Sequence, residues 1–178
     1  MIRLQVSLDG LDEAVSEFAA LPRQIERASK RTIRKVTAFA TSQLARQVAL
    51  TTQIPLSVLI HKGKGRRISS RIAPDGSGAV WLGYNPVKSG YIGQLQQDEG
   101  GAWARQFYFE KGFVARMRSG HQGVFKRFGK ARLPIDEQTV AMLGAKDAAE
   151  RVAKLVGPRL RDVMRQELNY EVNVRGVK

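Results

Sequence analysis

Residues 23–52 read RQIERASKRTIRKVTAFATSQLARQVALTT, and their spacing predicts one long amphipathic helix. At about 100° per residue, small and apolar side chains gather on one side of this helix and bases on the other. The predicted inner side holds Ile25, Ala28, Thr32, Val36, Phe39, Ala40, Gln43 and, at its edge, Leu44. At 1.5 Å per residue the helix is about 45 Å long, so we expect it to pack along other elements or to project from the body of the protein.

The outer side of this helix is basic. It holds Arg23, Arg27, Lys30, Arg31, Arg34 and Lys35. Only Glu26 is nearby, and several of these bases are spaced i, i+4, where like charges destabilise a helix by about 0.2–0.5 kcal/mol per pair. The pattern therefore predicts that acidic groups outside the helix neutralise it. We expect these groups to be phosphates or carboxylates of another molecule, so that charge reversal at Arg27, Arg31 and Arg34 abolishes assembly and leaves the monomer folded.

The positive charge of the chain is concentrated in two blocks. The formal net charge is +14, and residues 23–72 carry twelve bases and one acid, while residues 105–132 carry eight bases and one acid. Such blocks predict contact with a polyanion, either nucleic acid or the acidic surface of another protein. Within the first block, residues 61–71 combine bases with Gly and Ser and predict a flexible basic loop that leads into a strand. The candidate polyanion- or partner-binding residues are Arg23, Arg27, Lys30, Arg31, Arg34, Lys35, Lys62, Lys64, Arg66, Arg67 and Arg71.

Short segments with strand patterns follow and precede the helix. Residues 2–8 and 79–84 are typical of strands because apolar side chains recur in them at strand spacing or in a short run. Residues 113–117 and 124–128 flank a Ser-Gly turn and predict a β-hairpin. Residues 133–136 are expected to leave the sheet that this hairpin forms.

The C-terminal third returns to helical spacing between Val152 and Leu168. Gly157 and Pro158 lie inside that pattern, which predicts two helices that meet near residue 157, with one kinked helix as the alternative. The tail, residues 170–175, could form a last strand. Together these elements predict an α+β fold in a single domain, residues 1–178. In it a small, mostly antiparallel sheet packs against the long N-terminal helix and a C-terminal helical pair.

The sequence offers little for catalysis or metal binding. It has no cysteine, and its two histidines, His61 and His121, lie in predicted turns without the i, i+4 partner of a helical metal site. No phosphate-binding glycine loop or nucleophile-elbow motif is present. We therefore expect no catalytic, cofactor-binding or metal-binding residues, and a protein that is not an enzyme. A nuclease-like alternative would need clustered carboxylates. The candidates for such a cluster are Asp75, Asp98, Glu99 and Asp136.

The segment from Gly112 to Arg127 reads GFVARMRSGHQGVFKR, and Leu133-Pro134-Ile135-Asp136-Glu137 follows it. This segment resembles the lambda-type minor tail protein Z family of tailed phages and prophages. The long basic helix, the Lys/Arg-rich loop after it and the helix that follows Pro158 are similar in kind to those of the family. Residues 73–104 have no counterpart that we recognise.

The resemblance implies a structural role in the phage tail. Family members are tail-completion proteins at the head-proximal end of the tail, needed for head–tail joining, and related neck proteins form rings around the DNA channel, often sixfold. The implied partners are copies of the chain itself in a ring, with a hexamer as one candidate, neighbouring tail or neck proteins, and passing double-stranded DNA bound non-specifically. The implied location is the virion tail, after synthesis in the host cytoplasm, without a membrane partner. The alternative is a non-specific architectural nucleic-acid-binding protein, because the two basic blocks fit that function as well.

Overall fold

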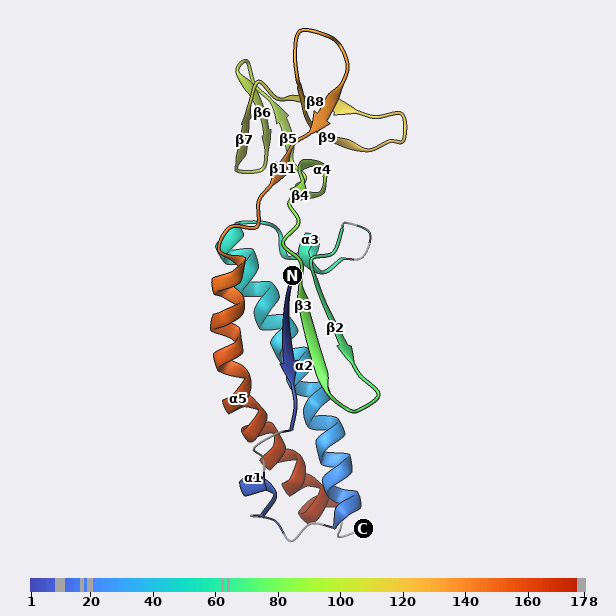
Figure 1. Ribbon diagram of the computed structural model, residues 1–178, viewed down its shortest axis with the longest axis vertical. Helices are drawn as coiled ribbons and strands as arrows, with labels where there is room; N and C mark the ends of the chain where they lie inside the picture. Colours follow the sequence, from blue (N-terminus) through green and yellow to red (C-terminus); the bar gives the residue numbers. More distant parts are fainter. Residues whose placement is uncertain (9–11, 17, 19–20, 62, 64, 176–178) are drawn as a thin grey trace.

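Two long helices, α2 (Pro22–Thr52) and α5 (Ala145–Asn169), lie side by side and antiparallel, and form the shaft of an elongated molecule (Figure 1). This computed structural model describes residues 1–8, 12–16, 18, 21–61, 63 and 65–175. A head rich in β-strands, residues 87–140, sits at the end of the shaft where α2 ends and α5 begins. The expected α+β fold class is confirmed.

Helix α2 confirms the long helix predicted over residues 23–52 and begins one residue earlier, with Pro22 in its first turn. Proline is favourable there because the first-turn N–H groups have no partner inside the helix. The predicted inner side is buried at Ala28, Thr32, Val36, Ala40 and Leu44 and half-buried at Ile25, Phe39 and Gln43. The helix therefore packs along its length instead of projecting into solvent.

The shaft includes a three-stranded antiparallel sheet in the order β1-β3-β2, one face of which lies on α2 (Figure 1). Its strands are β1 (Ile2–Val6), β2 (Ile68–Ile72) and β3 (Gly78–Leu82). Gly78 opens the central strand at its closest approach to the helix, since a Cβ atom there would lie 2.0 Å from Oγ1 of Thr37. Only glycine fits this contact without moving the sheet away from α2.

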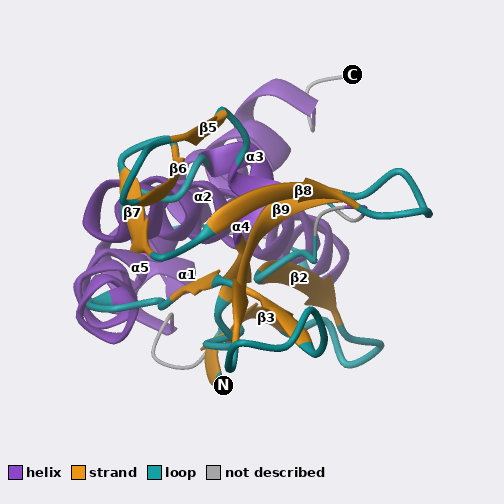
Figure 2. Cartoon of the chain, turned by 90° about the horizontal axis from the view of Figure 1, so that it is seen from above, coloured by secondary structure: helices purple, strands orange, loops and turns teal. Residues whose placement is uncertain are grey.

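The head contains two small antiparallel sheets that contact each other (Figure 2). One consists of β5 (Leu95–Gln97), β6 (Gly101–Ala104) and β7 (Phe107–Glu110); the other consists of β8 (Phe113–Arg116), β9 (Gln122–Arg127) and β10 (Ile135–Glu137). The β8–β9 pair confirms the predicted hairpin. The expectation that residues 133–136 leave this sheet is wrong, because β10 pairs with β9 and extends it.

Two short strands join the head to the shaft. They are β4 (Val87–Lys88), which follows the shaft sheet, and β11 (Thr139–Val140), which precedes α5. They pair antiparallel, with Val87 opposite Val140. Two short helices lie near this junction: α3 (Leu56–Ile60) and α4 (Ser89–Ile92). The stretch 73–104, which had no recognised family counterpart, thus supplies the central shaft strand and the first strands of the head.

The C-terminal third differs from the prediction at two points. The division into two helices at residue 157 is wrong, because α5 continues through Pro158. Pro158 and Lys154 are both exposed, so water can bind the Lys154 carbonyl that the proline leaves without a helical partner. The tail does not form a strand, because residues Tyr170–Arg175 form a π-helical turn, η2, that continues α5.

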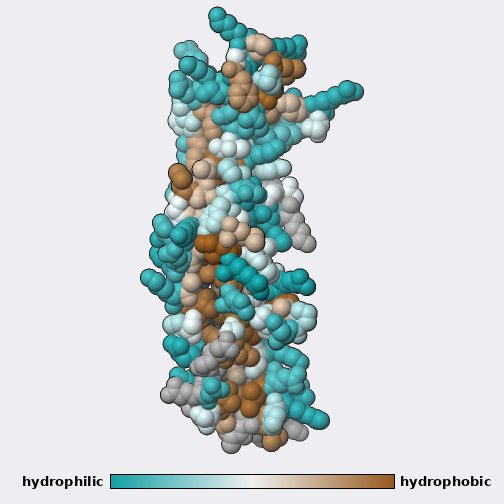
Figure 3. Space-filling view, viewed as in Figure 1, coloured by the Kyte–Doolittle hydropathy of each residue, from teal (hydrophilic) through white to brown (hydrophobic). Residues whose placement is uncertain are grey.

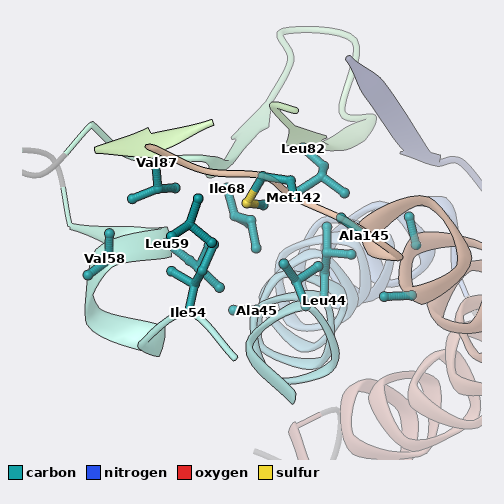
Figure 4. Close-up of a cluster of buried hydrophobic side chains, with 14 of the residues drawn as sticks. Leu44, Ala45, Ile54, Val58, Leu59, Ile68, Leu82, Val87, Met142 and Ala145 are labelled. Carbon is teal, nitrogen blue, oxygen red and sulfur yellow. The ribbon is translucent and has the colours of Figure 1, made fainter. Parts of the chain in front are cut away.

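The main core runs from the helix pair into the head. Figure 4 shows Leu44 of α2 facing Ile68, Leu82 and Met142, which come from the shaft sheet and from the segment before α5. A second, smaller cluster lies at the lower end of the shaft, where Ile33 and Val36 of α2 meet Met164 and Leu168 of α5. The short helix α1 (Asp12–Ser16) contacts α5 near this lower cluster.

Candidate functional site

A buried ion-pair network lies where the basic side of α2 meets the end of α5. The Arg31 guanidinium donates one hydrogen bond from Nε to Glu167 and another from Nη1 to Oε1 of Glu171 at 2.5 Å. The Nζ atom of Lys35 lies 2.5 Å from Oε1 of Glu167. Glu167 and Glu171 are only 5 % and 1 % exposed. The acidic groups that the sequence required outside α2 therefore exist, but they belong to the same chain.

The network reaches further along both helices. Arg27 lies 4.0 Å from Glu171, and Arg175 donates to the same carboxylate at 3.3 Å. Lys30 forms an exposed pair with Glu26 at 2.5 Å. The expectation that another molecule neutralises this face is wrong for Arg31 and Lys35, because buried carboxylates of α5 and η2 already do so.

Both buried glutamates remain ionised at neutral pH. Burial by itself would raise the pKa of Glu167, but hydrogen bonds from Lys35 and Arg31 outweigh it and lower the pKa below its ordinary value. The same balance lowers the pKa of Glu171, where burial is opposed by Arg31 and then by Arg175. Burial also opposes the charge of Arg31, yet the two glutamates together raise its pKa.

Acidification is expected to weaken the shaft through these two carboxylates. Their folded pKa values lie below the unfolded ones, so the stability that they contribute is present above the unfolded pKa and is lost as pH falls through the folded pKa. Glu167→Gln should therefore lower the free energy of unfolding by about 1–2 kcal/mol at pH 7 and by much less at about pH 3. Urea denaturation across this pH range measures the difference. Glu26→Gln, at the exposed pair, is the matched control. A loss of unfolding free energy in Glu167→Gln that is the same at pH 7 and at about pH 3 would contradict the prediction.

The other predicted site residues fall into three groups. Arg23, Arg34, Arg66 and Arg71 are exposed and form no ion pair with a carboxylate in the described part of the chain. Arg67 has a structural role: it donates to the carbonyls of Asn85 and Pro86, each at 2.7 Å, and to that of Gly65. Lys62 and Lys64 lie outside the described residues. The nine described residues of the predicted set thus divide between the ion-pair network, exposed positions without an ion pair and the structural contact of Arg67.

The second basic block, residues 105–132, lies entirely in the head. Residues 111–135 contain seven bases and no acid. The bases are Lys111, Arg116, Arg118, Lys126, Arg127, Lys130 and Arg132. All seven are exposed, and none forms an ion pair within the described ranges. The charge of this block was visible in the sequence, but the block lacks a regular spacing that would place its bases on one face. The helical spacing of α2 does so, and the predicted site residues therefore came from α2 and the loop after it.

Two loops carry three of these bases, Arg118, Lys130 and Arg132. The turn between β8 and β9, residues 117–121, extends sideways from the head, and the loop between β9 and β10, residues 128–134, forms its top (Figure 1). Hydrophilic side chains protrude from the molecule at both places (Figure 3). The top loop also exposes two large apolar side chains, Phe128 at 76 % and Leu133 at 66 %. Bases combined with exposed apolar groups at a loop tip are typical of a surface that a partner covers.

A family model described as Prophage minor tail protein Z (GPZ) matches residues 8–175. The chain belongs to the prophage minor tail protein Z family. No curated protein and no solved structure matches it. Membership in the minor tail protein Z family makes the chain a structural component of a phage tail and hence of the virion.

The described residues of this tail protein hold no group of three or more His, Cys, Asp or Glu side chains that could bind a metal ion. The carboxylates of the nuclease-like alternative lie on separate elements: Asp75 between β2 and β3, Asp98 and Glu99 between β5 and β6, and Asp136 on β10. Within the described ranges, no helix is both long and apolar enough to cross a bilayer.

Proposed function

We propose that this member of the minor tail protein Z family is a tail-completion protein that forms a ring of its own copies at the head-proximal end of the tail, around the DNA channel. The observation that carries the proposal is the acid-free basic segment, residues 111–135, at one end of an elongated molecule. It supports placing the head of each copy toward a polyanion, with the shaft extending away from it.

The chemistry of the top loop fits passing DNA. Duplex DNA presents one phosphate charge per about 1.7 Å of its axis, and exposed Lys and Arg side chains bind it without reading its sequence. Lys130 and Arg132 of this loop are exposed side chains of this kind, and so is Lys126 near the end of β9 that leads into it. Contacts to the phosphates that do not read the nucleobases let DNA slide past the protein, as a channel requires. The exposed bases Arg23, Arg34, Arg66 and Arg71 on the shaft remain secondary candidates for contact with DNA or with an acidic neighbouring ring.

The shaft supports assembly with neighbours. Leu50 and Leu143 lie at its upper end and Leu155 midway along α5, and all three are exposed. Covering these leucines in an assembly would remove apolar surface from water, which favours association. Copies of the same chain and adjacent tail or neck proteins are the partners that we propose for them.

Reversing the top-loop charges is expected to abolish head–tail joining without unfolding the protein. The variant Lys130→Glu with Arg132→Glu places two acids where we propose that a polyanion lies. Lys146→Glu with Lys154→Glu, at exposed positions on α5, changes the net charge equally and should join tails normally. The assay mixes each purified protein with filled heads and tails that lack it, and electron microscopy counts the tailed particles. Normal joining by the top-loop variant would refute the proposal.

The basic head also favours the second candidate, a non-specific architectural nucleic-acid-binding protein. That function requires the isolated monomer to bind duplex DNA with a log–log salt slope near −0.9 for each phosphate contacted. The same pair of variants separates the two functions. An architectural protein would lose DNA binding without any effect on tail joining, whereas the tail-completion protein would lose joining.

A further inference from the structure

The shaft sheet ends on both sides in a strand that has only one neighbour. Strand β3 lies between β1 and β2, and no further strand pairs with either outer strand in the described part of the chain (Figure 1). The outer edge of such a strand carries main-chain N–H and C=O groups without a ladder partner, and a strand of another chain can bond to them. Both outer edges of the shaft sheet are therefore available for pairing.

A hydrogen bond at the end of the β2–β3 ladder shows which residues of β2 point outward. The Gly83 N–H donates to the Arg67 carbonyl at 2.7 Å, which makes these two residues a bonded pair. Bonded and non-bonded pairs alternate along an antiparallel ladder, so the odd-numbered residues of β2 bond to β3. The N–H and C=O groups of Ser70 and Ile72 therefore point away from β3, and both residues are exposed.

The same alternation determines the outer edge of β1. Val80 of β3 turns its main-chain groups toward β1 and bonds to Leu4, which lies opposite it. Arg3 and Gln5, on either side of Leu4, therefore point away from the sheet. Neither forms a main-chain hydrogen bond with any residue that the structure describes, and both are exposed. Each edge thus offers two residues that are ready to pair.

The edge of β1 opens onto a groove of about 230 Å³ between this strand and α5. Most of its lining is apolar, with Leu4 and Val6 on the strand and Val156, Gly157 and Leu160 on the helix. A Cβ atom added to Gly157 would have no described neighbour within 4 Å, so there is room here for a side chain from outside. A strand that pairs with β1 places alternate side chains on the side of the sheet where this groove lies.

The edge of β2 supplies an apolar side chain for this groove. Ile72 is the last residue of β2 and is 44 % exposed. It lies on the same face of the sheet as the buried Ile68, because side chains alternate along a strand. In the isolated chain a large part of this isoleucine therefore remains in water on the face that elsewhere forms the core. Removing it from water favours association.

We propose that β2 of one copy pairs in parallel with β1 of the next copy, with Ile72 in the groove, an inference that rests on the proposed ring. The two edges differ, so the contact is heterologous, and a heterologous contact repeated by a closing rotation generates a ring. Both strands run antiparallel to β3, so a rotation axis roughly along the strands brings them side by side in the same direction. Two identical edges, in contrast, meet about a twofold axis and end the assembly at a dimer.

One register fits the main chain and the side chains together. In a parallel pair, a bonded residue bonds to the two neighbours of the residue that it faces. Gln5 therefore faces Arg71 of the next copy, donates to the Ser70 carbonyl and accepts from the Ile72 N–H, the groups that point outward. Ile72 then lies beside Val6, which lines the groove.

Charge favours this register over the next one. Arg3 faces Ser69 of the next copy in the proposed register, whereas a shift by two residues toward the start of β1 would place it opposite Arg71. Like charges directly opposite each other on neighbouring strands destabilise a sheet. The register with Gln5 opposite Arg71 has no such repulsion.

Cysteine pairing tests the contact with the full-length chain, which has no cysteine of its own. The variant Gln5→Cys with Arg71→Cys places two thiols on neighbouring strands of adjacent copies, within the range of a disulfide. Inside one chain these positions lie on either side of Ala79, about 10 Å apart, so they cannot form a disulfide with each other. Mild oxidation is therefore expected to give a ladder of trimers and longer species on a non-reducing denaturing gel. Gln5→Cys with Arg118→Cys, which moves one thiol to the head, should give no ladder.

Two further variants block the contact without a cysteine. Ser70→Pro removes a main-chain N–H that points away from β3, so the chain should stay folded while self-association weakens about tenfold. Ser70→Ala keeps the N–H and should associate like the wild type. Gly157→Leu fills the groove and should weaken association by a similar factor, whereas Lys154→Leu, exposed on the same helix and outside the groove lining, should have no effect. Sedimentation velocity and native mass spectrometry measure the oligomers, and circular dichroism checks that each variant is folded.

The inference is overturned if the double-cysteine chain forms nothing longer than a dimer, or if the wild-type chain stays monomeric at its highest soluble concentration. Association of Gly157→Leu as tight as that of the wild type would also overturn it. Closed rings of the wild-type chain without a cysteine ladder would keep the proposed function and remove only the strand contact. A ladder together with normal tail joining by Lys130→Glu with Arg132→Glu would do the reverse.

Discussion

Replacing Arg31 with methionine is expected to lower the free energy of unfolding by about 3 kcal/mol, because the substitution leaves buried carboxylates without their main partner. Arg31 bonds to both Glu167 and Glu171, and no other residue in the described part of the chain bridges the two. Methionine keeps most of the aliphatic volume of the side chain, so the loss reports charge and hydrogen bonding more than packing. Breaking a buried ion pair costs about 3–5 kcal/mol of stability. The lower end applies here because Arg31 itself is partly exposed.

Arg34→Met provides the matched control for this experiment. Arg34 lies on the same helix, is exposed and forms no ion pair with a described carboxylate, so its replacement should change stability by less than about 0.5 kcal/mol. Urea denaturation of both variants gives the comparison, and equal losses would refute the assigned role of Arg31. Charge reversal at Arg27, Arg31 and Arg34 together would therefore unfold the shaft, and it cannot test assembly by itself.

Leu44→Ala is expected to cost about 2–5 kcal/mol, the range for removing a large side chain from a packed interior. Leu44 is fully buried where α2 meets the shaft sheet and the segment before α5. Truncation leaves a cavity among residues of four separate elements, which cannot all move inward to fill it. A loss of this size would remove much of the stability of an ordinary domain.

Leu50→Ala is the control for the core substitution. It makes the same chemical change six residues later on the same helix, at a side chain that is 67 % exposed. Its effect should be within about 0.5 kcal/mol, because little surface is removed from water there on folding. Thermal and urea unfolding measure both variants. Similar losses at the two positions would mean that Leu44 does not pack as the structure shows.

The sequence predicted helix α2 and the β8–β9 hairpin correctly, because the residues that determine each of them are close together in the chain. Helix α2 has a consistent helical period between two prolines, and its predicted bounds were correct to within one residue. The β8–β9 hairpin was predictable because turn residues separate two strand-like runs. Pro158 shows where local rules fail: packing of α5 along α2 keeps the helix continuous at a residue that by itself favours a break.

The ion-pair network could not be assigned from α2 alone, because Arg31 and Glu167 are 136 positions apart. The spacing of residues in α5 nevertheless indicated that Glu167 and Glu171 lie on its buried side. Leu160, Met164 and Leu168 continue at helical spacing toward Glu167 and Glu171, so both acids lie on the side of the helix that its apolar residues define. Acids on an apolar helix face require buried cations, and the basic side of α2 was the available source.

The way the chain passes between shaft and head has a consequence for how tail proteins of this kind can diversify. The polypeptide leaves the shaft through β4 and returns through β11, and these strands run side by side with Val87 opposite Val140. Everything between them is an insert whose two ends meet at one point, and the core of the protein continues from the shaft into this insert through Ala102, Ala104 and Val124. A phage that received residues 87–140 from another by recombination would therefore keep a folded tail protein only where the new head matches the shaft side chains of that shared core.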